Sequence, residues 1–117
     1  MNAGAIDEKK TVEMIRKDGY PLPSAYEWVE VNLGEEEDGK RVYELLSENY
    51  VEDDDNMFRF DYSVEFLRWA LLPPNYYKEW IVGVQVKKTK KLVAFITAIP
   101  LHLMVSYYSC SYLFLML

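Results

Sequence analysis

Apolar and polar residues alternate in the stretch YEWVEVNL, from Tyr26 to Leu33. Successive side chains of a strand point to opposite faces, so this alternation predicts a short β-strand. The residues before it are polar at first and then include Gly19, Pro21 and Pro23. Proline fixes its own φ and pushes the residue before it towards extended backbone. Residues 1–25 are therefore predicted to form an extended arm with turns.

Two later stretches have the apolar spacing of helices. The first is KRVYELLSENYV, which is predicted to end as a helix near Asn49. Acidic residues in the preceding GEEEDGK stretch lie where the dipole of this helix favours negative charge. Its apolar face is formed by Val42, Leu45, Leu46 and Tyr50.

The second helix is predicted after Ser63, whose hydroxyl suits an N-cap. Pro73 and Pro74 end it, because proline lacks the N–H that a helix needs. Trp69 within it, like Trp80 further on, is expected to lie in the core or to line a groove. The apolar face of this helix is formed by Phe66, Leu67, Ala70 and Leu71.

A β-hairpin is predicted next, with Trp80–Val86 and Leu92–Ile99 as its strands and KKTK in its turn. Both strands are rich in β-branched residues and are expected to be largely buried. Residues 57–62 alternate as well and are interpreted as a strand or an extended loop. The order β-α-(β)-α-β-β places the chain in the α+β class.

The composition and charge of the chain limit the classes of function that it can have. The chain has 117 residues, half of them hydrophobic, which fits one domain with a core. Its net charge of −6 argues against nucleic-acid binding and is compatible with a cationic peptide partner. A single cysteine, Cys110, excludes an internal disulfide and suits a cytoplasmic location. The only histidine, His102, lies in an apolar stretch, and no catalytic residue is assigned.

The last seventeen residues, LHLMVSYYSCSYLFLML, contain no Asp, Glu, Lys or Arg. A membrane span needs about 20 predominantly apolar residues. Pro100 interrupts the apolar run, and serines and tyrosines dilute the tail, so no firm membrane span is predicted. The tail is expected to pack in a core or to remain unpacked.

The acidic run from Glu52 to Asp55, with Asn56 after it, precedes alternating aromatic residues and has three interpretations. A solvated turn is the simplest. A calcium loop needs alternating acids, a glycine at its sixth position and a glutamate at its twelfth, which DDDNMFRFDYSV does not provide. In a recognition loop, the acids would attract a cationic group while the aromatic rings exclude water and strengthen the contact.

The segment ENYVEDDDNMFRFDYSVEFLRWALLPP resembles the signature of the glycylpeptide N-tetradecanoyltransferases, the N-myristoyltransferases. The similarity begins near YPLPSAYEWVEVNL and continues through WIVGVQVKKTKKLVAFITAIP, from Tyr20 to Pro100. On this basis the chain divides into a polar N-terminal arm (1–19), part of the N-terminal domain of that family (20–100) and an apolar divergent tail (101–117).

Members of that family transfer a myristoyl group from myristoyl-CoA to the N-terminal glycine of proteins. The resemblance implies a partial acyl-CoA N-acyltransferase (GNAT-like) fold, a mixed sheet with flanking helices that is incomplete in this chain. It implies myristoyl-CoA as a co-substrate, no permanently bound cofactor and no metal. The expected partners are peptides whose N-terminal glycine is followed by small polar and basic residues.

Residue roles follow from the matching positions of the motif. Asn49, Tyr50 and Val51 match positions near the acyl chain, the last two close to its reactive end. The acids would select a cationic peptide, and the aromatic residues would hold its backbone. The residues expected to bind the peptide substrate are Tyr50, Val51, Glu52, Asp53, Asp55, Phe58, Arg59, Phe60 and Tyr62.

Other parts of the family pattern are not found in this sequence. They are an upstream FW segment with TQPV, an NFLCVH strand whose backbone amides polarise the thioester, and a basic loop that binds CoA phosphates. The chain is therefore expected to be a fragment of the catalytic unit that is inactive alone. The alternatives are a non-catalytic fragment that binds Gly-peptides and a truncated product without function.

Overall fold

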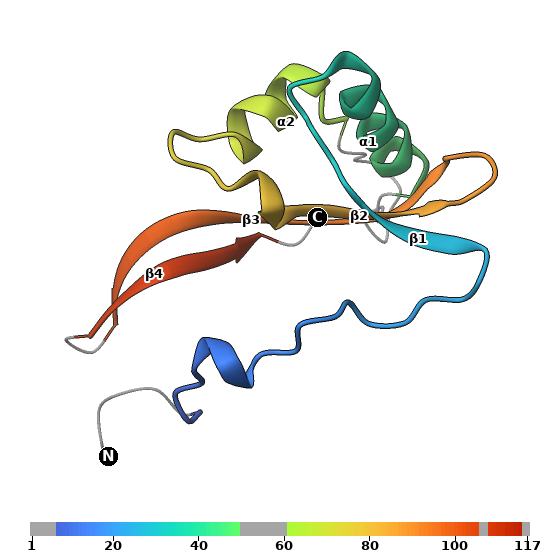
Figure 1. Ribbon diagram of the computed structural model, residues 1–117. Helices are drawn as coiled ribbons and strands as arrows, with labels where there is room; N and C mark the ends of the chain where they lie inside the picture. The colour runs from blue at the N-terminus through green and yellow to red at the C-terminus, as the bar shows by residue number, and fades with distance from the viewer. Residues whose placement is uncertain (1–6, 50–60, 106–107, 116–117) are drawn as a thin grey trace, which may run out of the picture.

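The computed structural model describes residues 7–49, 61–105 and 108–115, with side chains as far as His102 (Figure 1). Two helices and a four-stranded sheet confirm the α+β class. The elements are, in chain order, η1 (Val12–Met14), β1 (Tyr26–Glu30), α1 (Glu36–Asn49), α2 (Val64–Leu71), η2 (Lys78–Trp80), β2 (Ile81–Val86), β3 (Leu92–Val105) and β4 (Tyr108–Leu115).

The strands lie in the order β1-β2-β3-β4, so spatial neighbours are also neighbours in the sequence of strands. Every pair is antiparallel, with Trp28 opposite Val84 and Val84 opposite Ala94. Short connections between β2, β3 and β4 favour this arrangement, because a tight turn can join antiparallel strands only. The resemblance implies a mixed sheet, whereas the strands in the described part of the chain are antiparallel throughout.

The second strand of the hairpin is longer than its sequence predicts. It is predicted to end at Ile99, but β3 continues to Val105 and is followed by β4. Pairing of β3 with β2 stops at Thr97, and its pairing with β4 shifts in register just after Pro100. Pro100 thus lies where β3 has one neighbouring strand and an irregular ladder, a position that tolerates a residue without an N–H. Much of the apolar end of the chain is therefore paired strand.

Both helices lie on the same face of the sheet (Figure 1). Their predicted apolar faces supply Val42, Leu67 and Leu71, none of which exposes any surface. Burying one such leucine stabilises the fold by about 1.5–3 kcal/mol relative to leaving it exposed. The whole buried core comprises Val31, Leu33, Val42, Leu67, Leu71, Ile81, Leu92 and Phe95.

Helix α1 begins at its acidic lead-in, as the sequence predicts. Glu36, Glu37 and Asp38 occupy the first turn, where the helix dipole favours negative charge. The carboxylate of Asp38 also accepts a hydrogen bond from the backbone N–H of Asn32 at 2.8 Å. This bond fixes the loop that leads from β1 into the helix. The helix extends to Asn49, where its end is predicted.

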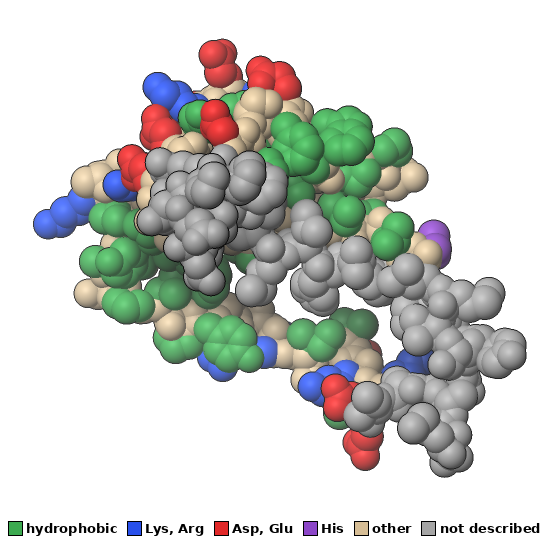
Figure 2. All heavy atoms as spheres, turned by 180° about the vertical axis from the view of Figure 1, so that it is seen from behind, with side chains coloured by type: hydrophobic (Ala, Val, Ile, Leu, Met, Phe, Trp, Pro, Cys, Tyr) green, Lys and Arg blue, Asp and Glu red, His purple; other side chains and the backbone are tan. Residues whose placement is uncertain are grey.

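Helix α2 begins after Ser63, whose Oγ accepts a hydrogen bond from the N–H of Phe66 at 3.1 Å. The predicted N-cap is therefore confirmed. Of the predicted apolar face, Leu67 and Leu71 are buried, whereas Phe66 is 43% exposed. Its ring packs instead on that of Tyr62. Hydrophobic side chains lie together on the surface over α2 (Figure 2).

The other face of the sheet is only partly covered. Val82 and Val84 are half-buried there and Ile96 is 41% exposed, so the hairpin is buried mainly on its helix-facing side rather than largely buried. The N-terminal arm runs on this side (Figure 1). Trp28 attaches the arm to β1, because its Nε1 donates a hydrogen bond to the carbonyl oxygen of Tyr20 at 2.9 Å.

Candidate functional site

The site expected from the sequence occupies the connection between α1 and α2. The structure describes both ends of this connection, including Asn49 and Tyr62. The roles of the remaining residues stay predictions, as does the strand or extended loop predicted at 57–62. The expected site residues outside the described part of the chain are Tyr50, Val51, Glu52, Asp53, Asp55, Phe58, Arg59 and Phe60.

Asn49 is the last residue of α1 and is exposed. Its Nδ2 donates a hydrogen bond to the carbonyl oxygen of Leu45 at 2.9 Å. Both residues belong to the end of α1, so this bond ties the side chain of Asn49 back onto its own helix. Asn49 thus stabilises the end of α1 at the point where the candidate site begins.

The end of α1 is also electrostatically suited to a cation. Its last turn contains no basic residue. A helix C-terminus carries a partial negative charge on its carbonyl groups, which stabilises nearby cations. Within that turn, Glu48 forms an exposed ion pair with Lys91 of the β2–β3 turn at 3.6 Å. The helix dipole therefore favours positive charge at this end of α1, and the Lys91 ammonium supplies part of it.

Tyr62 lies at the other end of the connection and is half-buried against the core. Its ring stacks on that of Phe66, with centroids 5.1 Å apart and planes 14° apart. Phe66 in turn contacts Trp69, at a centroid separation of 5.8 Å. The aromatic residue that closes the candidate site is therefore held on α2 by a row of rings.

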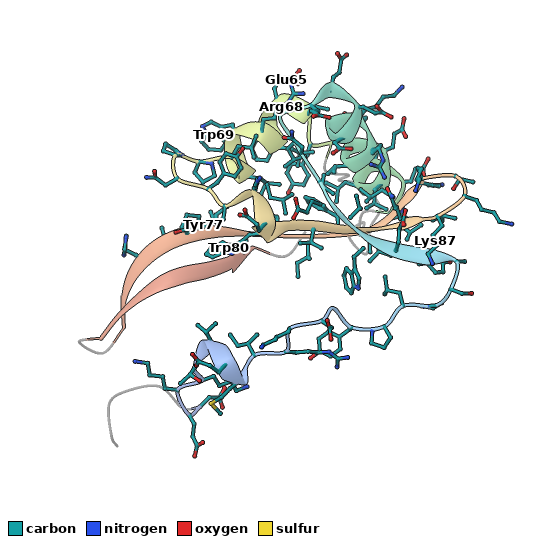
Figure 3. The ribbon with its side chains drawn as sticks, in the orientation of Figure 1. Glu65, Arg68, Trp69, Tyr77, Trp80 and Lys87 are labelled. Carbon is teal, nitrogen blue, oxygen red and sulfur yellow. The ribbon has the colours of Figure 1, made fainter. Side chains whose placement is uncertain are left out.

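Trp69 and Trp80 lie outside the central core. Trp69 is 78% exposed on the outer side of α2, which excludes the first of its two predicted places, the core (Figure 3). Trp80 is half-buried and packs on Tyr77, with ring centroids 4.5 Å apart. The other alternative, that Trp69 and Trp80 line a groove, stays a prediction.

A hydrogen bond that the sequence does not predict joins α1 to the end of the connection. The hydroxyl of Tyr43 donates to the Asp61 carboxylate at 2.8 Å. Tyr43 is half-buried, which restricts its ring. In the sequence, Tyr43 stands out only because it lies beside the apolar face of α1. That position does not indicate Asp61 as its hydrogen-bond partner.

A second group of contacts fixes α2 against α1 and against the loop that precedes α1. Arg68 donates from Nε to the carbonyl oxygen of Leu33 at 2.7 Å and from Nη2 to that of Glu35 at 3.4 Å. The helices approach closely at Gly39, where an added Cβ would lie 2.7 Å from Val64 Cγ1. These contacts set the separation of the two helices that carry the ends of the candidate site.

A polar groove of about 760 Å³ lies between α1 and the β2–β3 turn. Arg41 crosses it, donating to Asp38 at 2.9 Å, to Gln85 Oε1 at 2.6 Å and to the carbonyl oxygen of Lys90 at 2.7 Å. These hydrogen bonds occupy both terminal nitrogens of the guanidinium. The polar side chains of the groove therefore bond to one another, and we interpret the groove as part of the fold rather than as a ligand site.

The network continues to β1. Gln85 is buried and donates to Glu27 at 2.8 Å, and Lys90 forms an ion pair with the same carboxylate at 2.7 Å. The hydrogen bond from Lys90, followed by that from Gln85, lowers the pKa of Glu27 below its ordinary value of 4.5. This carboxylate thus links β1 to the hairpin in its ionised form.

Two kinds of feature are absent from the part of the chain that the structure describes. No group of three or more His, Cys, Asp or Glu residues is placed to hold a metal ion there. No helix among the described residues is long and apolar enough to cross a membrane.

Comparisons with known proteins converge on one family. A family model described as myristoyl-CoA:protein N-myristoyltransferase, N-terminal domain, matches residues 5–115. Glycylpeptide N-tetradecanoyltransferase of Dictyostelium discoideum is 59% identical over 93 residues, which cover 80% of this chain and 22% of the relative. The Plasmodium falciparum protein of the same name is 51% identical over 106 residues, or 91% of this chain and 26% of that one. The chain thus spans 22% and 26% of the lengths of these two relatives.

Solved structures show the same similarity. A crystal structure of Saccharomyces cerevisiae N-myristoyltransferase with bound myristoyl-CoA aligns with a TM-score of 0.80 at 46% identity, covering 91% of this chain and 25% of the other. A second structure of that protein with bound myristoyl-CoA gives a TM-score of 0.83 over 92% of this chain and 24% of the other. The family match extends beyond Tyr20–Pro100 at both ends and includes β4.

Proposed function

Because this chain belongs to the myristoyl-CoA:protein N-myristoyltransferase family, we propose that it serves the transfer of a myristoyl group to the N-terminal glycine of proteins. The observation that carries the proposal is the family match across residues 5–115. The acyl donor would be myristoyl-CoA, which is bound in the solved structures of the yeast relative. The acceptor would be a peptide with small polar and basic residues after its glycine.

Within that reaction, we assign this chain a role in holding the peptide. The negative end of α1 would attract the glycine ammonium, and the acids that follow would attract basic residues further along the peptide. Tyr62, fixed on α2 through Phe66, would support the aromatic wall. The proposed peptide-binding residues are Tyr50, Val51, Glu52, Asp53, Asp55, Phe58, Arg59, Phe60 and Tyr62, with Asn49, Tyr50 and Val51 near the acyl chain.

The chemistry itself needs further groups. The glycine amine must lose a proton, attack the thioester carbonyl carbon and form an amide as the CoA thiol leaves. A base must take that proton, and N–H donors must stabilise the oxyanion. The resemblance assigns neither the base nor the donors to residues of this sequence. We therefore propose peptide binding without turnover by this chain alone, in a cytoplasmic setting that suits its single cysteine.

Titration of the chain with a fluorescent peptide tests this function. The probe has an N-terminal glycine, a serine and two lysines near its start. Saturable binding is expected, and Asp53→Asn with Asp55→Asn should weaken it about tenfold or more, because two attractive charges are lost. Glu36→Gln with Glu37→Gln removes the same charge from the exposed first turn of α1 and should change it less than about threefold.

Two results would contradict the proposal. One is equal weakening by both pairs of substitutions, which would indicate general attraction to an acidic protein. The other is the absence of saturable binding by the unmodified chain. Amide-linked myristate on the peptide, after incubation of the purified chain with myristoyl-CoA, would show that the chain is catalytic alone.

A further inference from the structure

The open face of the sheet, on the side away from α1 and α2, is unusually apolar for a surface in contact with water. Residues that are Cα partners in neighbouring strands share a face, so Trp28, Val84 and Ala94 lie side by side on it. By this pairing, β2 and β3 place only apolar residues on the open face: Val82, Val84, Val86, Ala94 and Ile96.

The polar side chains of these two strands lie on the side of the helices instead. Gln85 is buried where Arg41 of α1 donates a hydrogen bond to it, and Thr97 is fully buried opposite Ile81. An antiparallel sheet with one face in water normally places its polar residues on that face. The two strands therefore have the pattern of a sheet that is covered on both faces.

The described residues cover the open face only in part. Trp28 is 47% exposed and Ile96 is 41% exposed. The N-terminal arm reaches Trp28 through the carbonyl oxygen of Tyr20, while both helices pack on the other side of the sheet (Figure 1). An exposed apolar patch on a sheet is typical of an interaction surface.

We propose that the open face binds the part of the N-myristoyltransferase fold that this chain does not match in its longer relatives. The chain matches a family model described as an N-terminal domain, and it covers 25% of the solved yeast relative. Those relatives thus contain further polypeptide that can pack on a sheet of this kind. The inference uses family membership and does not depend on peptide binding by the chain.

Charge argues against a second copy of the chain and against a membrane as the occupant. The chain has a net charge of −6, and the exposed Glu30 lies on the open face opposite Val82. A second copy would bring two acidic chains together, and an anionic lipid surface would repel the same charge. A neutral or basic part of a larger fold meets no such repulsion.

Co-expression tests this binding. The probe is the Dictyostelium discoideum relative without the 93 residues that align with this chain, produced together with the tagged full chain. We expect the two polypeptides to co-purify in equal amounts. Ile96→Lys should lower recovery of the partner about tenfold or more, because binding would bury an unpaired charge. Trp69→Lys, the matched control, places the same charge on the outer side of α2 and should lower recovery less than about twofold.

Thermal unfolding of the free chain separates binding from folding. Ile96 is already 41% exposed, so Ile96→Lys should change the Tm of the free chain by less than about 4 °C. Ala94→Lys is a second variant of the same exposed face, to be used if Ile96→Lys does not fold, and it should also lower recovery of the partner about tenfold. Equal recovery with the open-face variant and with Trp69→Lys would overturn the inference.

Three other results would overturn it as well. One is failure of the two polypeptides to co-purify. The second is a dimer of the free chain, seen by sedimentation velocity, that Ile96→Lys dissociates, because the occupant would then be a second copy. The third is flotation of the free chain with vesicles of phosphatidylserine and phosphatidylcholine. The fluorescent-peptide titration tests the proposed function on the free chain, so either proposal can fail without the other.

Discussion

The guanidinium of Arg68 in α2 donates from Nε to the carbonyl oxygen of Leu33, 2.7 Å away, at a residue with no exposed surface. This bond connects the second helix to the loop that follows β1. A carbonyl group that loses such a partner in a buried setting keeps the cost of its lost hydration. Arg68 therefore holds α2 against the loop that leads into α1.

Arg68→Met should lower the free energy of unfolding by about 1–3 kcal/mol, because it leaves the Leu33 carbonyl unsatisfied while keeping an apolar side chain of similar length. Urea denaturation followed by circular dichroism measures the change. Lys40→Met is the control: Lys40 is an exposed residue of α1 with an ion pair at 3.9 Å, and its loss should cost less than about 0.5 kcal/mol. Equal effects of the two substitutions would contradict this account.

Gly39→Ala should destabilise the protein, although alanine normally stabilises a helix by about 0.8–1.0 kcal/mol relative to glycine. The added Cβ would lie 2.7 Å from Val64 Cγ1, so α2 must shift. Overpacking of this kind costs about 1–3 kcal/mol. Val64→Ala removes the clashing methyl groups, so Gly39→Ala should be neutral or stabilising in that background. Denaturation of the four proteins tests this, and a stabilising single substitution would refute the contact.

Thr97→Val should stabilise the fold by about 1 kcal/mol, because a buried hydroxyl without a hydrogen bond keeps its desolvation cost. Thr97 exposes no surface, and its Oγ1 has no hydrogen-bond partner among the residues that the structure describes. Valine has nearly the same shape and no polar atom. Thr97→Ser keeps the hydroxyl but loses a methyl group, so it should destabilise instead. Thermal unfolding compares the three proteins, and destabilisation by valine would indicate that the hydroxyl is bonded in solution.

Stability should fall in acid partly through Glu27, whose folded pKa lies below the ordinary value of 4.5 because Lys90 and Gln85 hydrogen-bond to the carboxylate. A group with a depressed folded pKa stabilises the fold above its unfolded pKa, and this contribution is lost as the pH falls through the folded pKa. Glu27→Gln should therefore be less stable than the unmodified chain at neutral pH, with the difference shrinking below pH 4.5.

The measurement is the free energy of unfolding of both proteins from about pH 7 to about pH 3. In a Lys90→Met background, the pH-dependent difference between Glu and Gln at position 27 should be smaller, because the largest cause of the shift is absent. A difference that persists unchanged at low pH would refute the assignment to the ionised carboxylate.

Local sequence patterns predicted those helices and strands that are determined by residues close together in the sequence. The helical spacing around Val42 gave α1 and its end at Asn49, and the hydroxyl of Ser63 marked the start of α2. Alternation and β-branched residues gave β1 and the hairpin, with Trp80 falling in η2 rather than in the strand. These features depend on backbone periodicity and on short-range capping, which the sequence records directly.

Contacts between distant residues were not predictable in this way. A polar side chain beside an apolar face does not name its partner, so the Tyr43–Asp61 bond and the Arg68–Leu33 bond appear only in the fold. Helical spacing put Phe66 on the apolar face of α2 but cannot distinguish burial in a core from stacking on Tyr62. The candidate site itself came from a family motif, and the described residues place only its two ends.

The antiparallel sheet also implies an order of assembly. Strands β2, β3 and β4 follow one another through short turns, so their pairing closes small loops. The β1–β2 ladder instead joins Tyr26 to Val86 and encloses both helices and the connection between them. Closing a longer loop costs more entropy and tends to be slower. We therefore expect the hairpins to form early and β1 to dock late, as the last strand to join the sheet.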